Sequence, residues 1–85
     1  MTELTLPSVH LNGTSRAVLT EGYQAAYAKV QEAIRAFQAI EMNGRDYYPQ
    51  GNDAYYKART QRDVQIAHLC SVCDYLEAHL MHLGE

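Results

Sequence analysis

Residues 19–40 read LTEGYQAAYAKVQEAIRAFQAI, and the apolar side chains in this stretch recur at alternating spacings of four and three residues. They form the stripe Leu19, Tyr23, Ala26, Val30, Ala33, Phe37 and Ile40. Residues 66–83, IAHLCSVCDYLEAHLMHL, repeat the rhythm with Ile66, Leu69, Cys73, Leu76, Leu80 and Leu83. This heptad spacing is typical of helices that pack at a shallow angle. We therefore predict an all-α fold in which these two stripes form the core.

Signals at both ends of the first stripe bound a helix over residues 15–42. Thr14 or Ser15 can cap its start by accepting a hydrogen bond from a free backbone N–H. Asn43-Gly44 is expected to end it, because glycine adopts the left-handed conformation at little cost.

The second stripe predicts a helix over residues 54–83, with Asn52 or Asp53 as its cap. Residues 45–51, between the two helices, are rich in turn formers and too short for another element. So short a loop makes the two helices antiparallel, and the fold is therefore a long helical hairpin.

The first 13 residues are expected to form an extended arm. Leu4 and Leu6 alternate with polar residues, Pro7 interrupts the pattern, and Val9 and Leu11 continue it. Alternation of this kind is typical of a half-buried extended segment. Because a lone strand needs a partner, we expect the arm to lie along the helices or along a neighbouring subunit.

A chain of 85 residues has room for one domain, which we assign to residues 1–85. Two helices cannot enclose a core, and short chains are often stabilised by oligomerisation. Further apolar or small side chains lie off the main stripes, at Ala25, Tyr27, Ala28, Ile34, Ala36, Ala39, Val72 and Tyr75. We therefore predict self-association, with a dimer that forms a four-helix bundle as the simplest closure and larger assemblies as the alternative.

The composition excludes several function classes. The formal charge of -3 makes the chain a poor general binder of long nucleic acid. No stretch approaches the roughly 18 apolar residues of a membrane span, and the start lacks the features of a signal peptide. There is no phosphate-binding glycine loop, nucleophile elbow or carboxylate pair. We expect a cytoplasmic protein that is not an enzyme and needs no cofactor.

The pattern breaks at the loop. The second stripe, extended backward from Ile66, meets Arg62, Arg59 and Tyr55, and buried arginine is rare without a partner. Residues 45–62 carry four basic and two acidic side chains and hold four of the seven tyrosines. Such departures from a consistent pattern are often functional sites.

These residue types suit a small nucleotide-like ligand. Arginine forks fit phosphate oxygens, tyrosine rings stack on bases, and amides read base or ribose edges. The free N–H groups at the start of the second helix add a place for an anion. The predicted ligand-binding residues are Asn43, Arg45, Tyr47, Tyr48, Gln50, Tyr55, Tyr56, Arg59 and Arg62.

Two plainer interpretations of the same cluster stay open. The tyrosines can cover the open end of the bundle, while Arg59 and Arg62 pair with acidic neighbours at Glu41, Asp46 or Asp63. Alternatively, the cluster is a protein interface, since Tyr and Arg are frequent in binding hot spots.

The cysteines and histidines of the second helix offer weaker hypotheses. Cys70 and Cys73 are interpreted as core thiols, because a redox pair normally opens a helix in a strand-rich fold. His79 lies opposite Cys70 around the helix, so one helix cannot direct a Cys₂His₂ set at one zinc ion. His79 and His82 can chelate a metal, but they also continue a flanking stripe that would form an acid-sensitive interface. We predict no metal site.

Three segments carry a resemblance: HLNGTS at residues 10–15, NGRDYYPQG at residues 43–51, and the Leu- and Glu-containing end of the second helix. They resemble a group of short helical-hairpin proteins encoded by bacteriophages and prophages. By analogy of size and class, phage proteins that sequester nucleotide immune signals, such as anti-CBASS and anti-Thoeris inhibitors, suggest the same role in an infected bacterial host. The alternative is a helical inhibitor or scaffold that binds a host or phage protein.

Overall fold

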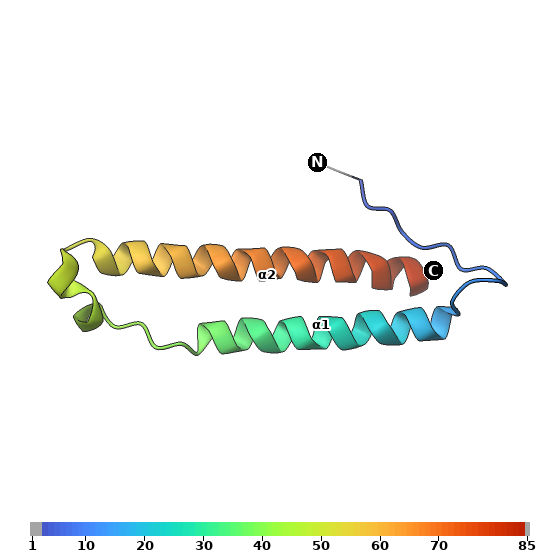
Figure 1. Ribbon diagram of the computed structural model, residues 1–85, viewed down its shortest axis with the longest axis horizontal. Helices are drawn as coiled ribbons and strands as arrows, with labels where there is room; N and C mark the ends of the chain where they lie inside the picture. Colours follow the sequence, from blue (N-terminus) through green and yellow to red (C-terminus); the bar gives the residue numbers. More distant parts are fainter. Residues whose placement is uncertain (1–2, 85) are drawn as a thin grey trace.

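The fold is a hairpin of two long antiparallel α-helices. The computed structural model describes residues 3–84. Helix α1 spans Arg16–Gln38 and helix α2 spans Ala54–Gly84, and the short 3₁₀ helices η1 (Gly44–Asp46) and η2 (Tyr48–Gln50) lie between them. Figure 1 shows α1 and α2 side by side, with the connecting loop at one end and the start of α1 near the end of α2 at the other. The predicted all-α hairpin is therefore confirmed.

Helix α1 begins where the capping signal predicted. The Ser15 hydroxyl accepts a hydrogen bond from the Val18 N–H (3.2 Å), and Ser15 itself has extended backbone angles. This bond satisfies one of the N–H groups that the first turn leaves free. Of the two candidates, Ser15 is thus the cap.

The predicted end of the first helix at residues 42–44 is wrong, since α1 ends at Gln38. The N–H of Ile40 bonds to the carbonyl of Phe37 in a tightened last turn, and the backbone is extended by Asn43. An extended chain advances about 3.3 Å per residue against about 1.5 Å in a helix. The early end lets the chain reach the start of α2, which at 31 residues is longer than α1 at 23.

The loop contains more regular structure than predicted. Residues 45–51 were expected to hold no further element, yet η1 and η2 occupy much of this segment. Gly44 does not end the first helix in the left-handed conformation, contrary to the prediction. Gly44 opens η1, whereas Gly51 has a φ of 132°, the only positive φ among residues 3–84. Because L side chains rarely adopt that angle, Gly51 is the residue that turns the chain into α2.

The arm touches the helices over a short segment. Leu6 and Pro7 are half-buried, and the His82 ring nitrogen Nε2 donates to the Pro7 carbonyl (2.8 Å). Leu4, Val9 and Leu11 are exposed, so the predicted alternation of buried side chains is wrong for most of the arm. Figure 1 shows the arm rising away from the hairpin toward the N-terminus. Of the predicted arm, residues 1 and 2 lie outside the described residues.

The core is small and lies toward the end of the hairpin where the termini lie. The buried side chains among residues 3–84 are Cys73, Leu76, His79 and Leu83, all on the second half of α2. Most of the first predicted stripe is half-buried, but Ala26 on α1 and Ile40 just beyond it are exposed, contrary to the prediction. No helix within residues 3–84 has the length and apolar character to cross a bilayer.

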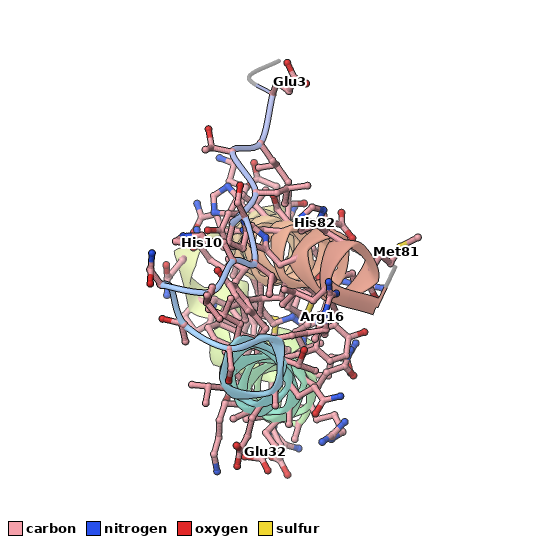
Figure 2. All side chains as sticks on the ribbon, turned by 90° about the vertical axis from the view of Figure 1, so that its right-hand side faces the viewer. Glu3, His10, Arg16, Glu32, Met81 and His82 are labelled. Atoms are coloured by element: carbon pink, nitrogen blue, oxygen red, sulfur yellow. The ribbon has the colours of Figure 1, made fainter. Side chains whose placement is uncertain are left out.

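A hydrogen bond between residues far apart in sequence closes the termini end. The Arg16 guanidinium, at the first residue of α1, donates to the carbonyl of Leu83 near the end of α2. Figure 2, which looks along the hairpin from this end, shows Arg16 directed toward α2 and Glu32 directed away from it. A cation at a helix C-terminus also interacts favourably with the helix dipole. Arg16 therefore joins the two helices at the end of the hairpin opposite the loop, where the facing residues are farthest apart in sequence.

Candidate functional site

The loop end, defined here as residues 39–62, brings three of its four tyrosines together. The rings of Tyr47 and Tyr55 have centroids 6.3 Å apart, and those of Tyr55 and Tyr56 are 5.3 Å apart in an edge-on arrangement. Tyr47 and Tyr55 are half-buried and Tyr56 is exposed. Tyr48 is exposed over 73% of its surface and pairs with no other ring in residues 3–84. The predicted aromatic set is thus one cluster of three and one separate ring.

Two shallow hollows lie against this cluster. One, of about 250 Å³, is lined by Tyr47, Gln50, Ala54, Lys57, Ala58 and Gln61. The other, of about 360 Å³, is lined by Asp53, Tyr56, Lys57, Thr60 and Gln61. The two hollows share Lys57 and Gln61, so they lie on either side of this pair of residues on α2. Phenol, ammonium and amide groups around the two hollows can stack on a planar ligand and hydrogen-bond to it.

Lys57, Thr60 and Gln61 were not among the predicted site residues. A signal for them was present, because Asp53, Lys57 and Gln61 follow one another at intervals of four residues. Residues four apart lie on one face of a helix. The Lys57 ammonium pairs with the Asp53 carboxylate at 3.0 Å, and both side chains are exposed.

The predicted arginines lie apart from these hollows. At about 100° per residue, Arg59 is about 160° and Arg62 about 140° around α2 from Lys57. Neither of them lines either hollow, and Arg45, in η1, does not either. The sequence therefore grouped side chains that the helix directs to different sides.

The three predicted arginines differ in whether they form an ion pair. Arg62 is half-buried and pairs with Asp63 at 3.3 Å, which confirms one of the expected acidic partners. Its Nε atom is buried without a hydrogen-bond partner among residues 3–84. Arg45 and Arg59 are exposed and form no ion pair within that range. The loop end thus presents two unpaired cations to solvent.

The two amide side chains that were predicted to contact base or ribose edges also lie in different places. Gln50 lines the smaller hollow. Asn43 lines neither hollow; it is half-buried just before η1, and its carbonyl accepts a hydrogen bond from the Asp46 N–H (3.1 Å). Asn43 therefore has a structural position in the loop.

His79 belongs to the core and not to a flanking stripe as predicted. Its ring is 1% exposed and stacks with Tyr23, with centroids 4.6 Å apart and an interplanar angle of 22°. It also contacts the Tyr75 ring at 4.3 Å, and its Nδ1–H donates to the Tyr75 carbonyl (2.9 Å). Because Nδ1 is used in this way and His82 bonds to the arm, the two rings are committed to packing. Residues 3–84 hold no group of three metal-ligating side chains suited to an ion.

The two thiols differ in environment. Cys73 is buried, as predicted, whereas Cys70 is exposed, so the prediction of a core thiol is wrong for Cys70. Burial raises the pKa of the Cys73 thiol, and the neighbouring Cys70 adds to the rise. A thiol with a raised pKa is less often a thiolate. Cys70 is the accessible sulfur of the pair because it is exposed.

A second polar contact joins the helices on one side of the core. The Tyr27 O–H donates to a Glu77 carboxylate oxygen at 2.6 Å. This hydrogen bond is the main reason that the pKa of Tyr27 is raised, with partial desolvation next. Tyr27 and Glu77 meet at one edge of the contact between α1 and α2. This edge is therefore a polar side of the hairpin.

Comparison of this chain with protein-family models, with curated proteins and with solved structures finds no match.

Proposed function

We propose that the protein is a non-catalytic binding protein that captures a small, anionic, nucleotide-like ligand at the loop end, and that it acts as an assembly of copies. The observation that carries this proposal is the pair of tyrosine-lined hollows that share Lys57 and Gln61. They lie at the one basic end of an acidic chain.

The size and chemistry of the hollows fit this class of ligand. Ligand sites usually measure about 300–1,000 Å³, and the two hollows, of about 360 and 250 Å³, flank Lys57 and Gln61 on α2. Tyr47 and Tyr56 would stack on the base, and Lys57 would hold a phosphate. Gln50 and Gln61 would hydrogen-bond to base or ribose edges. Stacking on an aromatic ring contributes roughly 1–3 kcal/mol per base in single-strand binders.

The exposed arginines have a different role in this proposal from the one that the sequence suggested. Arg45 and Arg59 would attract the anion through the positive potential of the loop end and contact outlying phosphates. Arg62 would stay with Asp63, its ion-pair partner. Capture without turnover needs no catalytic group, and sequestration of a nucleotide immune signal during phage infection is the role that we propose for it.

Self-association is the second part of the proposal. Only four side chains among residues 3–84 are buried, so a single hairpin has little core of its own. The hollows are also shallow on one chain. A dimer that forms a four-helix bundle would add a core and give each hollow a second wall.

Thermal denaturation with a panel of linear and cyclic nucleotides, including ADP-ribose derivatives, tests ligand capture. A ligand at about 100 times its dissociation constant adds roughly 2.7 kcal/mol, which raises the Tm of a small domain by several degrees. We expect one ligand class to give this shift and Lys57→Ala combined with Gln61→Ala to abolish it. The matched control is Arg35→Ala, which removes an exposed cation of α1 that lines neither hollow. A panel with no shift, or a shift that survives the double substitution, contradicts the proposal.

The exposed rings favour one alternative function, the binding of a host or phage protein. Tyr48 and Tyr56 are 73% and 64% exposed, and Arg59 on the same stretch of chain is also exposed. This alternative expects the nucleotide panel to stay silent. It also expects a defined protein partner whose binding is lost in Tyr48→Ala and Arg59→Ala, measured by titration calorimetry.

A further inference from the structure

The hairpin has one polar and one apolar side. The polar side carries the Tyr27–Glu77 hydrogen bond. A groove of about 290 Å³, lined by Val18, Leu19, Gly22, Tyr23, Ala26 and Leu76, lies along the other edge of the α1–α2 contact. At about 100° per residue, Gly22 and Tyr27 are about 140° apart around α1. The groove therefore opens away from the polar side.

Gly22 is the unusual residue of this groove. Glycine in the middle of a helix costs about 1 kcal/mol relative to alanine, because it loses more backbone freedom. A Cβ atom built on Gly22 meets nothing within 4 Å. The hairpin alone gives no steric reason for a glycine here. What the missing side chain provides is room for another backbone to approach α1.

Exposed apolar side chains of α2 lie on the same side of the hairpin as the groove. Val72 and Tyr75 are 43% and 45% exposed. They lie about 140° and 160° around α2 from Glu77, on the side opposite the polar contact. Tyr75 contacts His79, which in turn stacks with Tyr23 beside the groove. Both helices thus contribute to one apolar side that the chain itself leaves uncovered.

The accessible area of the chain indicates how much surface a partner would cover. The chain exposes 6599 Å², whereas a compact monomer of 9.6 kDa exposes about 5,100 Å². The shape agrees, because the radius of gyration is 18.6 Å against about 12 Å for a compact chain of this length. The excess is about 1,500 Å² per chain, or about 3,000 Å² for two copies. Obligate homodimers bury about 2,000–5,000 Å² in total.

The charges favour an antiparallel arrangement of two copies. The loop half, residues 29–65, has six basic and five acidic side chains, a net of +1. The termini half, residues 3–28 with 66–84, has one basic and four acidic side chains, a net of -3. An antiparallel dimer sets each positive half against the negative half of its partner, which a parallel dimer does not.

We propose that a second copy of this chain docks on the apolar side, antiparallel, about a two-fold axis that crosses α1 near Lys29. With the helices fully overlapped, Gly22 faces Ala36 of the partner subunit and Val18 lies near Ile40 of the partner subunit. Lys29, at the axis, is already paired with Glu32 at 3.6 Å, which offsets the approach of two like charges. The inference rests on the self-association proposed above and specifies its face and orientation.

This arrangement also connects the interface with the candidate site. Lys57 and Gln61 lie on the side of α2 that carries Val72 and Tyr75, as judged by their positions around the helix. In the antiparallel dimer the hollows of one chain therefore lie beside the termini end of the other. Each hollow would gain its second wall from the partner.

Sedimentation equilibrium on the full chain tests the face. Gly22→Leu fills the groove and is expected to raise the dimer dissociation constant at least ten-fold. Leucine favours helix over glycine, so circular dichroism of the variant should be unchanged. The matched control is Ala28→Leu, about 120° away around α1, which should leave the dissociation constant unchanged. A dimer that Gly22→Leu does not weaken overturns this face, whereas a wild-type monomer overturns self-association itself.

Cysteine cross-linking tests the orientation. In a background with Cys70→Ser and Cys73→Ser, oxidation of a variant with both Val18→Cys and Ile40→Cys should give a covalent dimer. Both positions are exposed in one chain, at 59% and 54%. Neither single variant should cross-link efficiently, because each residue lies far from its own copy. A covalent dimer from Val18→Cys alone indicates parallel chains and overturns the antiparallel arrangement.

Discussion

The two ends of α2 have the same secondary structure and opposite environments. Its second half holds every buried side chain among residues 3–84, including Leu76 and His79. Its first half, within the loop end, holds none, although Arg62 lies on the same helical stripe. A regular helix is thus well packed at one end and open at the other.

The difference follows from what lies opposite each half. Near the termini α2 faces α1, whose Tyr23 stacks on His79 and whose Arg16 bonds to the last turn of α2. Near the loop α1 has already ended at Gln38, and two short 3₁₀ helices take its place. No side chain of residues 39–62 is fully buried, and polar groups such as Lys57 stay exposed there.

The largest expected effect is at the packed end. Leu76→Ala should lower the free energy of unfolding by roughly 2–5 kcal/mol, because it removes a side chain that is only 6% exposed and leaves a cavity. At the loop end, Tyr48→Ala should change it by less than about 0.5 kcal/mol. Urea denaturation at one fixed chain concentration measures both. Equal costs at the two positions would contradict the contrast between the ends.

His79 gives the next largest effect. His79→Ala should cost roughly 1–3 kcal/mol, since it removes a ring that contacts both Tyr23 and Tyr75. His79→Phe keeps a ring of similar shape and should cost less, although it loses the hydrogen bond to the Tyr75 carbonyl. The same denaturation assay applies. If the alanine variant is no less stable than the phenylalanine variant, the stacked rings do not stabilise this end.

Hydrogen exchange can resolve the contrast within α2 itself. Amides of residues 73–83 should exchange roughly ten-fold or more slowly than those of residues 58–65, because few apolar contacts protect the first half. Mass spectrometry of overlapping peptides gives the rates. Uniform protection along α2 would mean that the helix opens as one unit and that its ends do not differ.

The Tyr27–Glu77 bond predicts a smaller effect that depends on pH. The folded state raises the pKa of Tyr27, mainly because its O–H donates to Glu77. The stabilisation is therefore complete below the ordinary tyrosine pKa of about 10 and is lost as pH rises through the raised value. The stability difference between wild type and Tyr27→Phe should shrink from pH 9 to pH 11. A stability difference that stays constant or grows over this range would mean that deprotonation of Tyr27 does not remove the stabilisation.

The smallest effect is expected at the surface of the loop end. Asp53→Asn breaks the ion pair with Lys57, in which both side chains are 70% exposed. Exposed pairs contribute about 0–1 kcal/mol, so thermal denaturation should hardly change. A loss well above 1 kcal/mol would mean that this pair holds the loop end together, and that the two ends are less different than the burial indicates.

The candidate site was only partly predictable. Sequence clustering located the loop end correctly as the place where Tyr47, Tyr55 and Tyr56 meet. It did not separate Arg59 from Lys57, because neighbours in sequence point to different sides of a helix. Helix positions alone could have grouped Asp53, Lys57 and Gln61. The smaller hollow also needs Tyr47 and Gln50, which the loop supplies.

What the sequence determined by itself is local. Apolar spacing of three and four residues defines two helices, Thr14 or Ser15 caps the first, and a short connection makes them antiparallel, because each depends on neighbours along the chain. The tertiary structure alone decided how each helix is rotated against the other and where α1 stops. Those two choices bury His79 instead of leaving it on a flank, and they leave Arg59 exposed. Rotation and length are set by packing between segments far apart in sequence, which no local spacing records.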